Sequence, residues 1–361
     1  MKKALKRIGM ALALLLVLLL IGAWSLFGTF IKAASGITKL QDGLYRLEYT
    51  GDYGFDKFLE QGGADSDGAV ADYIVSFLSH GFYQNTSEPT ESTFGCSTVC
   101  TSDENGTVYF GRNYDWQPSR AMLVHTKPKN GYESFSTCGI DFLGFGDDYT
   151  PDGSMAERFM SLAAIYVPLD GMNEKGLIVA DLMAGDKEET HQNGGKTDLT
   201  TTTAIRLLLD KAASTDEAVE LLKQYDMHSS VGSAHHFAIA DASGKSVVVE
   251  YVNGELSVTE ADIVTNHYLT DSAKKGIGSE QSHARYEKLT ELYRHADADG
   301  VRDMLAAVAQ SNYPQTEGEE EITVWSVVYR PSEKTAEFYF NERYDAPYTL
   351  SLSDKTDFVK R

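Results

Sequence analysis

A cysteine at the head of a predicted β-hairpin is the feature that most constrains this chain. The stretch Cys96–Val99 consists of short, partly β-branched residues, which favour an extended strand. Asp103–Gly106 then has the composition of a tight turn, and Thr107–Phe110 is a second strand-forming run. The chain is therefore expected to bring a thiol against its own next strand without help from a distant segment.

The expected turn decides which side chains meet that thiol. A turn centred on positions 104 and 105 places Cys96 opposite Asn113, with Arg112 next to it and Asp115 at the end of the returning strand. A nearby cation favours the thiolate form of a cysteine, and polar neighbours can orient a base. We therefore interpret the hairpin as carrying an activated cysteine. Cys100, on the same face of the strand, is expected to be a core residue.

The charge of the chain restricts its partners. The 361 residues carry a formal net charge of -21, and none of the 53 acidic residues lies within the first 32 positions. The main part of the chain is strongly acidic, so we expect that it does not bind nucleic acid or anionic membrane surfaces through general electrostatics. With 42% hydrophobic and 11% aromatic residues, the chain is expected to form one large or two ordinary globular domains.

The N-terminus has the pattern of a membrane segment. Basic residues within positions 2–7 precede an uncharged, mostly apolar run from Ile8 to Ile31, which is long enough to cross a bilayer of about 30 Å. The basic cluster favours an N-terminus in the cytoplasm and a body outside the cell. We predict that residues 1–35 form an uncleaved signal anchor in the cell membrane. The alternative is a signal peptide cleaved within Lys32–Ser35, with the body secreted.

Residues 36–95 have the character of a propeptide. Leu40–Tyr49 is expected to be a strand, and Asp65–Leu78 a helix with one apolar face. Asn85–Ser92 is polar, contains a proline and shows no periodicity, so it predicts an exposed loop just before the cysteine. A propeptide junction would lie in such a loop, which leaves residues 96–361 as the main domain.

In the main domain, strands come first, pairs of helices follow, and strands close the chain. The expected strands are Leu177–Met183, His235–Asp241, Ser246–Tyr251, Glu255–Thr259, Ile322–Tyr329 and Thr335–Phe340. The expected helices are Thr201–Lys211, Thr215–Gln224, 282–294 and 299–311. Loops at 117–160 and 184–200 are expected to shape a pocket. This order predicts an α+β protein in which two largely antiparallel sheets are layered.

Cysteine and histidine usage indicates neither a metal nor a cofactor. Cys96, Cys100 and Cys138 are too few for a disulfide framework. His235 and His236 are adjacent, so on a strand their side chains would point to opposite faces, which is a weak signal for a metal. We therefore expect no bound metal and no cofactor.

Four stretches of the chain stand in the order and at the spacing of a known family's motifs. They are Cys96 with Gly111–Trp116, Asp170–Leu177, His236–Glu250 and Val264–Asn266. In these stretches the chain resembles the choloylglycine hydrolase family of N-terminal-nucleophile hydrolases, which includes bile salt hydrolases and penicillin V acylases. The resemblance runs from Cys96 to about Arg285 and more weakly to the C-terminus. It implies an αββα four-layer sandwich whose nucleophile is the first residue of the mature chain.

The resemblance also implies a set of catalytic residues. Cys96 matches the family's nucleophile, and its other catalytic-site positions are matched by Arg112, Asp115, Asn266 and Arg285. At Met183 the chain departs from the family, which often has Asn or Tyr there, and this puts the substrate preference in doubt. The implied role at that position belongs to the backbone N–H, which would bind an oxyanion together with the Asn266 side chain.

An N-terminal cysteine brings its own base. The pKa of a free α-amine is about 7.7 to 8.0, so a fraction of it is neutral near neutral pH and can accept the thiol proton. The expected reaction is attack of Cys96 Sγ on an amide carbonyl, departure of the amine, and hydrolysis of the thioester. Arg112 is expected to stabilise the thiolate, Asp115 to hold the α-amine, and Arg285 to fix the charge pattern. Because the amine must be free, we predict self-cleavage of the Gly95–Cys96 bond.

The leading prediction is a membrane-tethered or secreted hydrolase of linear, non-peptide amides. Its small-molecule substrate would be a conjugated bile salt, a penicillin V-like side-chain amide or another N-acyl amine. One alternative is an acyltransferase in which an amine replaces water, and another is an inactive, membrane-anchored binding protein. A cysteine protease that uses His235 or His236 fits the sequence less well. The sequence leaves open whether the chain forms a homo-oligomer.

Overall fold

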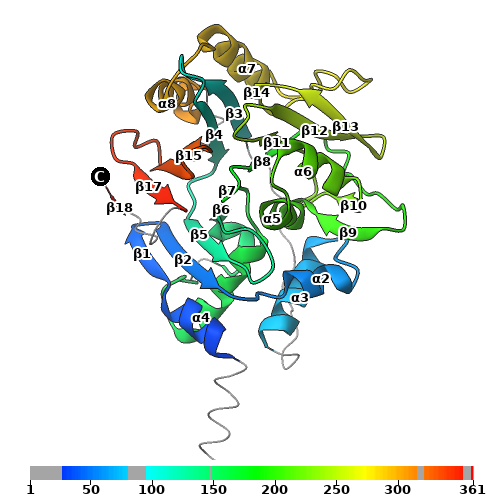
Figure 1. The fold of residues 1–361 in the computed structure, drawn as a ribbon, viewed down its shortest axis with the longest axis vertical. Helices are drawn as coiled ribbons and strands as arrows, with labels where there is room; N and C mark the ends of the chain where they lie inside the picture. Colours follow the sequence, from blue (N-terminus) through cyan, green and yellow to red (C-terminus); the bar gives the residue numbers. More distant parts are fainter. Residues whose placement is uncertain (1–26, 80–94, 147, 315–320, 353–358, 361) are drawn as a thin grey trace, which may run out of the picture.

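Two β-sheets stacked face to face form the centre of the protein (Figure 1). The computed structural model describes residues 27–79, 95–146, 148–314, 321–352 and 359–360. Nine described strands form the larger sheet, in the order β1 (Thr38–Gln41), β2 (Leu44–Thr50), β5 (Ala121–Lys127), β6 (Ser134–Gly139), β7 (Asp170–Asn173), β8 (Ile178–Met183), β11 (His235–Ala240), β12 (Ser246–Val252) and β13 (Glu255–Glu260). Seven form the smaller sheet, in the order β14 (Ile263–Val264), β3 (Gly95–Ser102), β4 (Val108–Trp116), β15 (Ile322–Arg330), β16 (Thr335–Phe340), β17 (Tyr348–Ser351) and β18 (Val359–Lys360).

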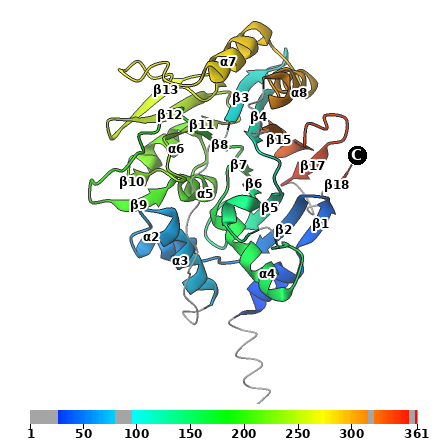
Figure 2. The same ribbon diagram turned by 180° about the vertical axis from the view of Figure 1, so that it is seen from behind.

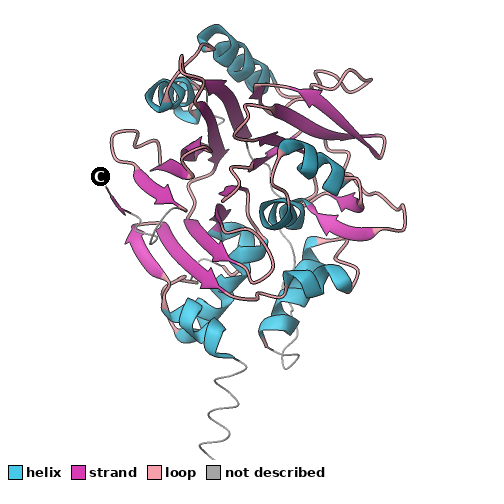
Figure 3. Cartoon of the chain, in the orientation of Figure 1, coloured by secondary structure: helices cyan, strands magenta, loops and turns pink. Residues whose placement is uncertain are grey.

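Helices cover the outer faces of both sheets, which completes four layers (Figures 2 and 3). The smaller sheet is covered by α7 (Glu280–Leu292) and α8 (Ala298–Ala307), and the larger one by α5 (Thr201–Lys211) and α6 (Thr215–Leu222). The remaining described elements are α2 (Phe55–Glu60), α3 (Asp67–Leu78), α4 (Met155–Met160), the 3₁₀ turns η1 (Ile140–Leu143), η2 (Ser161–Tyr166) and η3 (Gln310–Asn312), and the parallel pair β9 (Thr197–Thr200) and β10 (Tyr225–His228). The predicted αββα sandwich is confirmed for this part of the chain.

Burial on both faces explains the composition of the central strands. The residues of β8 and β11 are all buried, because one face of each strand meets the smaller sheet and the other meets α5 and α6. Phe110 and Leu123 belong to the apolar layer between the sheets. Leu305 packs in a separate cluster between α8 and the smaller sheet.

The hairpin of β3 and β4 forms as predicted, but its register differs from the prediction by one residue. Cys96 lies opposite Tyr114. The cause is the turn, in which Asp103 N donates to Thr107 O at 2.9 Å and Asp103 Oδ1 accepts from Thr107 N at 2.8 Å, so that five residues close the loop rather than four. A one-residue shift exchanges the faces of a strand. Arg112 therefore shares a face with Cys96, whereas the predicted register placed it on the other face.

Two further predictions about local structure are wrong. The predicted strand Leu40–Tyr49 is two strands, β1 and β2, because Gly43 with a φ of 75° makes a turn between them. The predicted loop 117–160 contains β5 and β6, which pair with each other inside the larger sheet. β6 is rich in serine and threonine, so its place in the sheet depends on its neighbours more than on its own composition.

The predicted membrane segment Ile8–Ile31 lies mostly outside the described residues. Residues 27–35 are helical and pack on the body of the protein, where the Phe30 ring centroid lies 6.1 Å from that of Tyr49. Among the described helices, none is long and apolar enough to cross a bilayer. The last part of the predicted anchor, residues 1–35, thus lies within the globular body.

The described part of residues 36–95 is also built into the larger sheet. β2 pairs in parallel with β5 along its whole length, from Leu44 opposite Ala121 to Thr50 opposite Lys127. Behind this pair, the hydroxyl of Tyr53 donates to Asp210 on α5 at 2.6 Å. The segment that precedes the cysteine therefore shares a hydrophobic core with the segment that follows it.

Gly111 on β4 allows α8 to approach the sheet closely, since a Cβ there would lie 2.6 Å from Val301 Cγ1 and 3.0 Å from Leu305 Cδ1. We predict that Gly111→Ala lowers the free energy of unfolding in urea by about 1–3 kcal/mol through overpacking. Val301→Ala should also destabilise the protein, but the double variant should lose less than the sum of the two single losses. Additive losses would contradict a steric clash between these two residues.

Candidate active site

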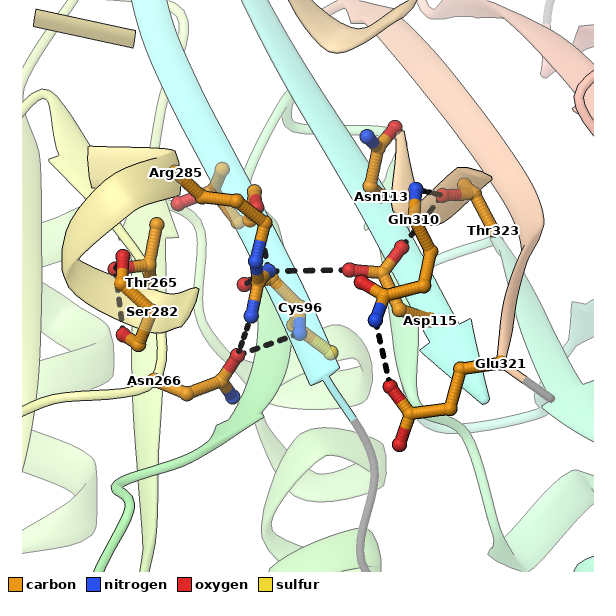
Figure 4. A network of polar contacts seen from close by, with 12 residues as sticks. Cys96, Asn113, Asp115, Thr265, Asn266, Ser282, Arg285, Gln310, Glu321 and Thr323 are labelled. Carbon is orange, nitrogen blue, oxygen red and sulfur yellow. Dashed lines mark hydrogen bonds and ion pairs between the residues drawn. The ribbon is translucent and has the colours of Figure 1, made fainter. Parts of the chain in front are cut away.

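Cys96 lies at the start of β3, where groups from both sheets and from α7 converge (Figure 4). Its side chain points into the layer between the sheets and is 0% exposed. Gly95 and Asp115 lie opposite each other on the other face of the hairpin, toward α7. The thiol and the backbone of one residue therefore meet different sets of polar groups.

Arg112, on β4, brings a positive charge to the thiol. Its Nη2 lies 3.3 Å from Cys96 Sγ and also donates to Asp181 O at 2.8 Å. Its Nη1 forms an ion pair with Asp170, and its guanidinium carbon lies 5.1 Å from the centre of the Tyr114 ring. A guanidinium held in this way stays charged, and a fixed cation beside a sulfur favours its thiolate form.

Asp170, at the start of β7, belongs to this candidate site although the sequence analysis did not single it out. Its buried carboxylate accepts hydrogen bonds from Arg112, from Trp325 Nε1 at 2.9 Å and from Tyr329 OH at 2.5 Å. These contacts fix the guanidinium in one position. The available signal was that Asp170 opens one of the four family-like stretches. Its partners on β15 could not be predicted, because Trp325 lies 155 positions further along the chain.

Arg285, on α7, contacts the backbone of Cys96 and lies beside Asn266 and Asp115 (Figure 4). Its Nη1 donates to Cys96 O at 2.6 Å, to Ser97 Oγ at 2.8 Å and to Asp115 Oδ2 at 3.0 Å. Its Nη2 donates to Asn266 Oδ1 at 2.9 Å. This buried guanidinium joins predicted site residues from β3, β4 and the segment after β14 in one network.

The backbone nitrogen of Cys96 is held by Asn266, not by Asp115. Cys96 N donates to Asn266 Oδ1 at 2.7 Å. Asp115 Oδ1 accepts from Thr323 Oγ1 at 2.7 Å, and its Oδ2 binds the Arg285 guanidinium. Asp115 also lies against Gly95, since a Cβ on that glycine would be 3.3 Å from Asp115 Oδ2. Asp115 was expected to hold the α-amine of Cys96. While the Gly95–Cys96 bond is intact, its carboxylate lies beside Gly95 instead.

Met183 contributes backbone groups at the end of β8. Its carbonyl oxygen accepts from Asn266 Nδ2 at 2.9 Å. The next residue, Ala184, donates its N–H to Ala234 O at the extension of β11. Because backbone groups alternate along a strand, those of Met183 turn away from β11 and toward Asn266. The two groups predicted to bind an oxyanion thus lie on the same side of β8.

Burial dominates the ionisation of the thiol while the chain is intact. Burial raises the pKa of Cys96 to about 12, although the charge of Arg112 acts in the opposite direction. Burial also raises the pKa of Asp115, against the effects of Arg285 and the Thr323 hydrogen bond. The enclosed thiol is therefore protonated at neutral pH.

His235 and His236 point to opposite faces of β11, as expected. His235 Nδ1 lies 2.9 Å from Asp181 Oδ1, and His236 Nδ1 lies 3.0 Å from Glu250 Oε1. Each imidazole is thus hydrogen-bonded to a carboxylate. The thiol of Cys96 is instead within hydrogen-bonding distance of Arg112 Nη2. In the described ranges, no cluster of three or more His, Cys, Asp or Glu side chains could hold a metal ion.

Comparison with known sequences places most of the chain in one family model. Residues 101–345 match the model described as acyl-coenzyme A:6-aminopenicillanic acid acyl-transferase. A curated relative from Clostridium perfringens (strain 13 / Type A), named bile salt hydrolase/transferase, is 26% identical over 179 residues, which cover 46% of this chain and 51% of the relative. The chain thus spans about half the length of the curated relative that it matches.

Comparison with solved structures identifies the same fold. A conjugated bile acid hydrolase from Clostridium perfringens aligns with a TM-score of 0.55 and 18% identity, over 74% of this chain and 96% of that chain. A penicillin V acylase from Agrobacterium tumefaciens aligns with a TM-score of 0.50 and 17% identity, over 72% of this chain and 87% of that chain. The resemblance predicted from the four sequence stretches is confirmed by these matches.

The burial of Cys96 predicts that its thiol is protected as long as the Gly95–Cys96 bond is intact. Intact chain treated with iodoacetamide at pH 7 to 8 should show almost no modification of Cys96, because the sulfur is enclosed and its pKa is raised to about 12. Peptide mass spectrometry measures the modified fraction. The same chain unfolded in urea, in which all three cysteines should react, is the control. Rapid modification of Cys96 in folded, uncut protein would contradict the enclosed site.

Proposed function

Since the chain belongs to the acyl-coenzyme A:6-aminopenicillanic acid acyl-transferase family, we propose that it is an N-terminal-nucleophile enzyme that cleaves linear, non-peptide amides through Cys96. One observation carries this proposal. The backbone nitrogen of Cys96 is held by Asn266 Oδ1 at 2.7 Å, and its sulfur is held by Arg112 Nη2 at 3.3 Å. A residue that serves as both nucleophile and base needs separate partners for these two atoms.

The first step of the proposal is self-cleavage of the Gly95–Cys96 bond. Cys96 Sγ attacks the carbonyl carbon of Gly95, a carbon–sulfur bond forms, and the carbon–nitrogen bond breaks as the thiol proton passes to the departing nitrogen. Water then hydrolyses the thioester to leave a carboxylate on Gly95 and a free α-amine on Cys96. Glycine suits this step, since a Cβ would lie 3.1 Å from Asp115 Cβ and 3.4 Å from Arg285 Nη2.

The second step is attack on the substrate. The freed α-amine takes the thiol proton, Sγ attacks the substrate's carbonyl carbon, and the carbon–nitrogen bond breaks as the same proton passes to the leaving amine. Water then hydrolyses the thioester, which releases the acid and restores the thiol. Asn266 Oδ1, which already accepts from this nitrogen, would orient the amine. Arg112 would stabilise the thiolate, and the amide nitrogen of Asn266 with the N–H of Met183 would bind the oxyanion. Each such donor is often worth about 3 kcal/mol in the transition state.

In this proposal the segment before Cys96 stays bound after the cut. Its strand β2 is inserted beside β5, and Phe58 and Ile74 on its helices are buried in the core around α5. Removal of the segment would expose that apolar surface to water. Residues 27–35 pack on the body of the protein, so we propose further that the part of the predicted anchor before residue 27 attaches the enzyme to the cell membrane with its body outside the cell, or that cleavage in this part releases the enzyme. This rests on the basic residues that precede the apolar run.

A second candidate function is acyl transfer, in which an amine takes the place of water in the last step. The description of the matching family model and the name of the curated relative, bile salt hydrolase/transferase, favour it alongside hydrolysis. Both functions use the same thioester on Cys96, so they differ only in the acceptor. The proposed substrate is an N-acyl amine such as a conjugated bile salt or penicillin V.

We predict that purified protein consists of two fragments and that the second one begins at Cys96. Cys96→Ala should remain a single uncut chain and lose about a thousandfold or more of any amidase activity, because it lacks the nucleophile for both steps. Intact-mass analysis and Edman sequencing measure the cut. The two wild-type fragments should elute together in size-exclusion chromatography.

Cys100→Ala is the matched control for this experiment. Cys100 lies on the same face of the same strand and is buried, but it packs in the core and should tolerate substitution without loss of the cut. Gly95→Ala should be cut more slowly than wild type, because the added Cβ crowds Asp115 and Arg285. Active wild-type protein that is still one full-length chain would refute the proposal.

We predict that the mature enzyme releases the amine from at least one compound in a panel of taurine- and glycine-conjugated bile salts, penicillin V and simple N-acyl amino acids. Mass spectrometry of the products in water alone, and then with an added amine acceptor, distinguishes hydrolysis from transfer. A free acid in both conditions supports a hydrolase, and a new amide supports a transferase. Wild-type protein that is cut at Cys96 but turns over no member of the panel would contradict the proposed substrate class.

A further inference from the structure

The histidine pair on β11 has no part in the proposed chemistry, yet one of its members is linked to the active site. His235 is 5% exposed, and its Nδ1 lies 2.9 Å from Asp181 Oδ1. The backbone carbonyl of Asp181 accepts from Arg112 Nη2, the same nitrogen that lies 3.3 Å from Cys96 Sγ. His236 faces the other way, so this link belongs to His235 alone within the pair.

The hydrogen-bond partners of His235 favour a charged imidazole. Its Nε2 lies 3.0 Å from the carbonyl oxygen of Ser230, which can only accept a hydrogen bond. Its Nδ1 faces the carboxylate of Asp181, which also only accepts when it is ionised. Both ring nitrogens must then carry protons. Burial works against this charge, but the charge of Asp181 and the hydrogen bonds to Asp181 and Ser230, with a smaller effect of Asp67, outweigh burial, and the pKa of His235 is raised above its ordinary value.

The charge on this imidazole matters to the thiol. The negative charge of Asp181 acts to raise the pKa of Cys96, which disfavours the thiolate that attacks the substrate. A protonated His235 beside Asp181 offsets that charge. The other charged groups that face this pair or the thiol are Asp67 on α3, Arg112 and Asp115 on β4, and Arg285 on α7.

The loop that holds His235 is tied to the segment that precedes the cut. Asp67, the first residue of α3, accepts from Ser230 Oγ at 2.8 Å and from Val231 N at 2.9 Å. Val231 has a φ of 48°, an unfavourable conformation for a β-branched residue that must be held by its surroundings. Ser230 N is held in addition by Thr201 Oγ1 at 3.1 Å.

We propose that Asp181 and His235 are a positioning pair for Arg112 and the Cys96 thiolate, and that Asp67 holds this pair in place from the segment before the cut. The inference rests on the proposed role of Cys96 as nucleophile. Neither member of the pair touches the substrate or the sulfur. They act through the carbonyl of Asp181, which orients Arg112, and through the balance of charge beside the thiol.

We predict that His235→Gln moves the acidic limb of the pH profile of kcat/KM to higher pH by about one unit, which is a tenfold loss of activity below that limb. Glutamine can still donate to a carbonyl, but it leaves the Asp181 carboxylate without a positive partner, so the thiolate is disfavoured. Asp181→Asn removes the opposing charge and should move the limb to lower pH. The double variant should return the limb to near its wild-type position.

His125→Gln is the matched control. His125 is a buried histidine on β5 of the same sheet, and its Nε2 pairs with Glu133 at 2.8 Å, away from the active site. This variant should lose stability without moving the pH profile. If His235→Gln folds poorly, Asp67→Asn tests the same link from a half-buried position, because loss of the Asp67 charge lowers the pKa of His235, and its pH profile should then differ from that of His125→Gln.

The outcomes separate this inference from the proposed function. Wild-type protein that is not cut at Cys96, or that shows no thioester on it, overturns the proposed function. Wild-type protein that is cut and active, with His235→Gln and Asp67→Asn profiles that overlay that of His125→Gln, overturns only the positioning pair. Opposite shifts in the two single variants, cancelled in the double variant, support it.

Discussion

The burial of two guanidinium groups around one cysteine is the constraint on which the rest of this structure depends. A buried charge costs several kcal/mol unless a partner compensates it. The partner of Arg112 is Asp170, which is fixed in turn by Trp325 and Tyr329, and the partner of Arg285 is Asp115. These carboxylates lie on β7 and β4, one in each sheet. Neither charge is compensated until the two sheets and α7 have packed together, so the site exists only in the complete sandwich.

The register of one hairpin divides this site between two faces. Cys96 and Arg112 face the layer between the sheets, and Asp115 meets Arg285 on the helical side. The backbone of Cys96 lies between them, where Asn266 reaches its nitrogen. One residue can thus present its sulfur and its nitrogen to different partners, as a nucleophile that also supplies the base requires. The family membership and this division lead to the same proposed chemistry.

The segment before Cys96 contributes to both the core and the site. β2 lies inside the larger sheet, and Asp67 on α3 begins a chain of contacts that passes through Ser230, His235 and Asp181 to Arg112. The sequence indicated a propeptide here because a polar, proline-containing loop separates the region from the cysteine. Composition describes that junction but does not reveal which strand the region pairs with, since β2 and β5 lie more than 70 positions apart in the chain.

The sequence by itself determined the local elements and the chemical groups. Turn residues and β-branched runs predicted the hairpin, and apolar periodicity predicted α5 and α6. The family resemblance predicted that Arg112, Asn266 and Arg285 belong to the site of Cys96. The register of the hairpin is also local, since the hydrogen bonds between Asp103 and Thr107 set it, but the composition of the turn predicted it one residue off. Only the tertiary structure decided which carboxylates and hydroxyls complete the network around Cys96. The reason is physical: a turn or a helix is stabilised by neighbours in sequence, whereas a buried charge is stabilised by whatever group the folded chain brings beside it.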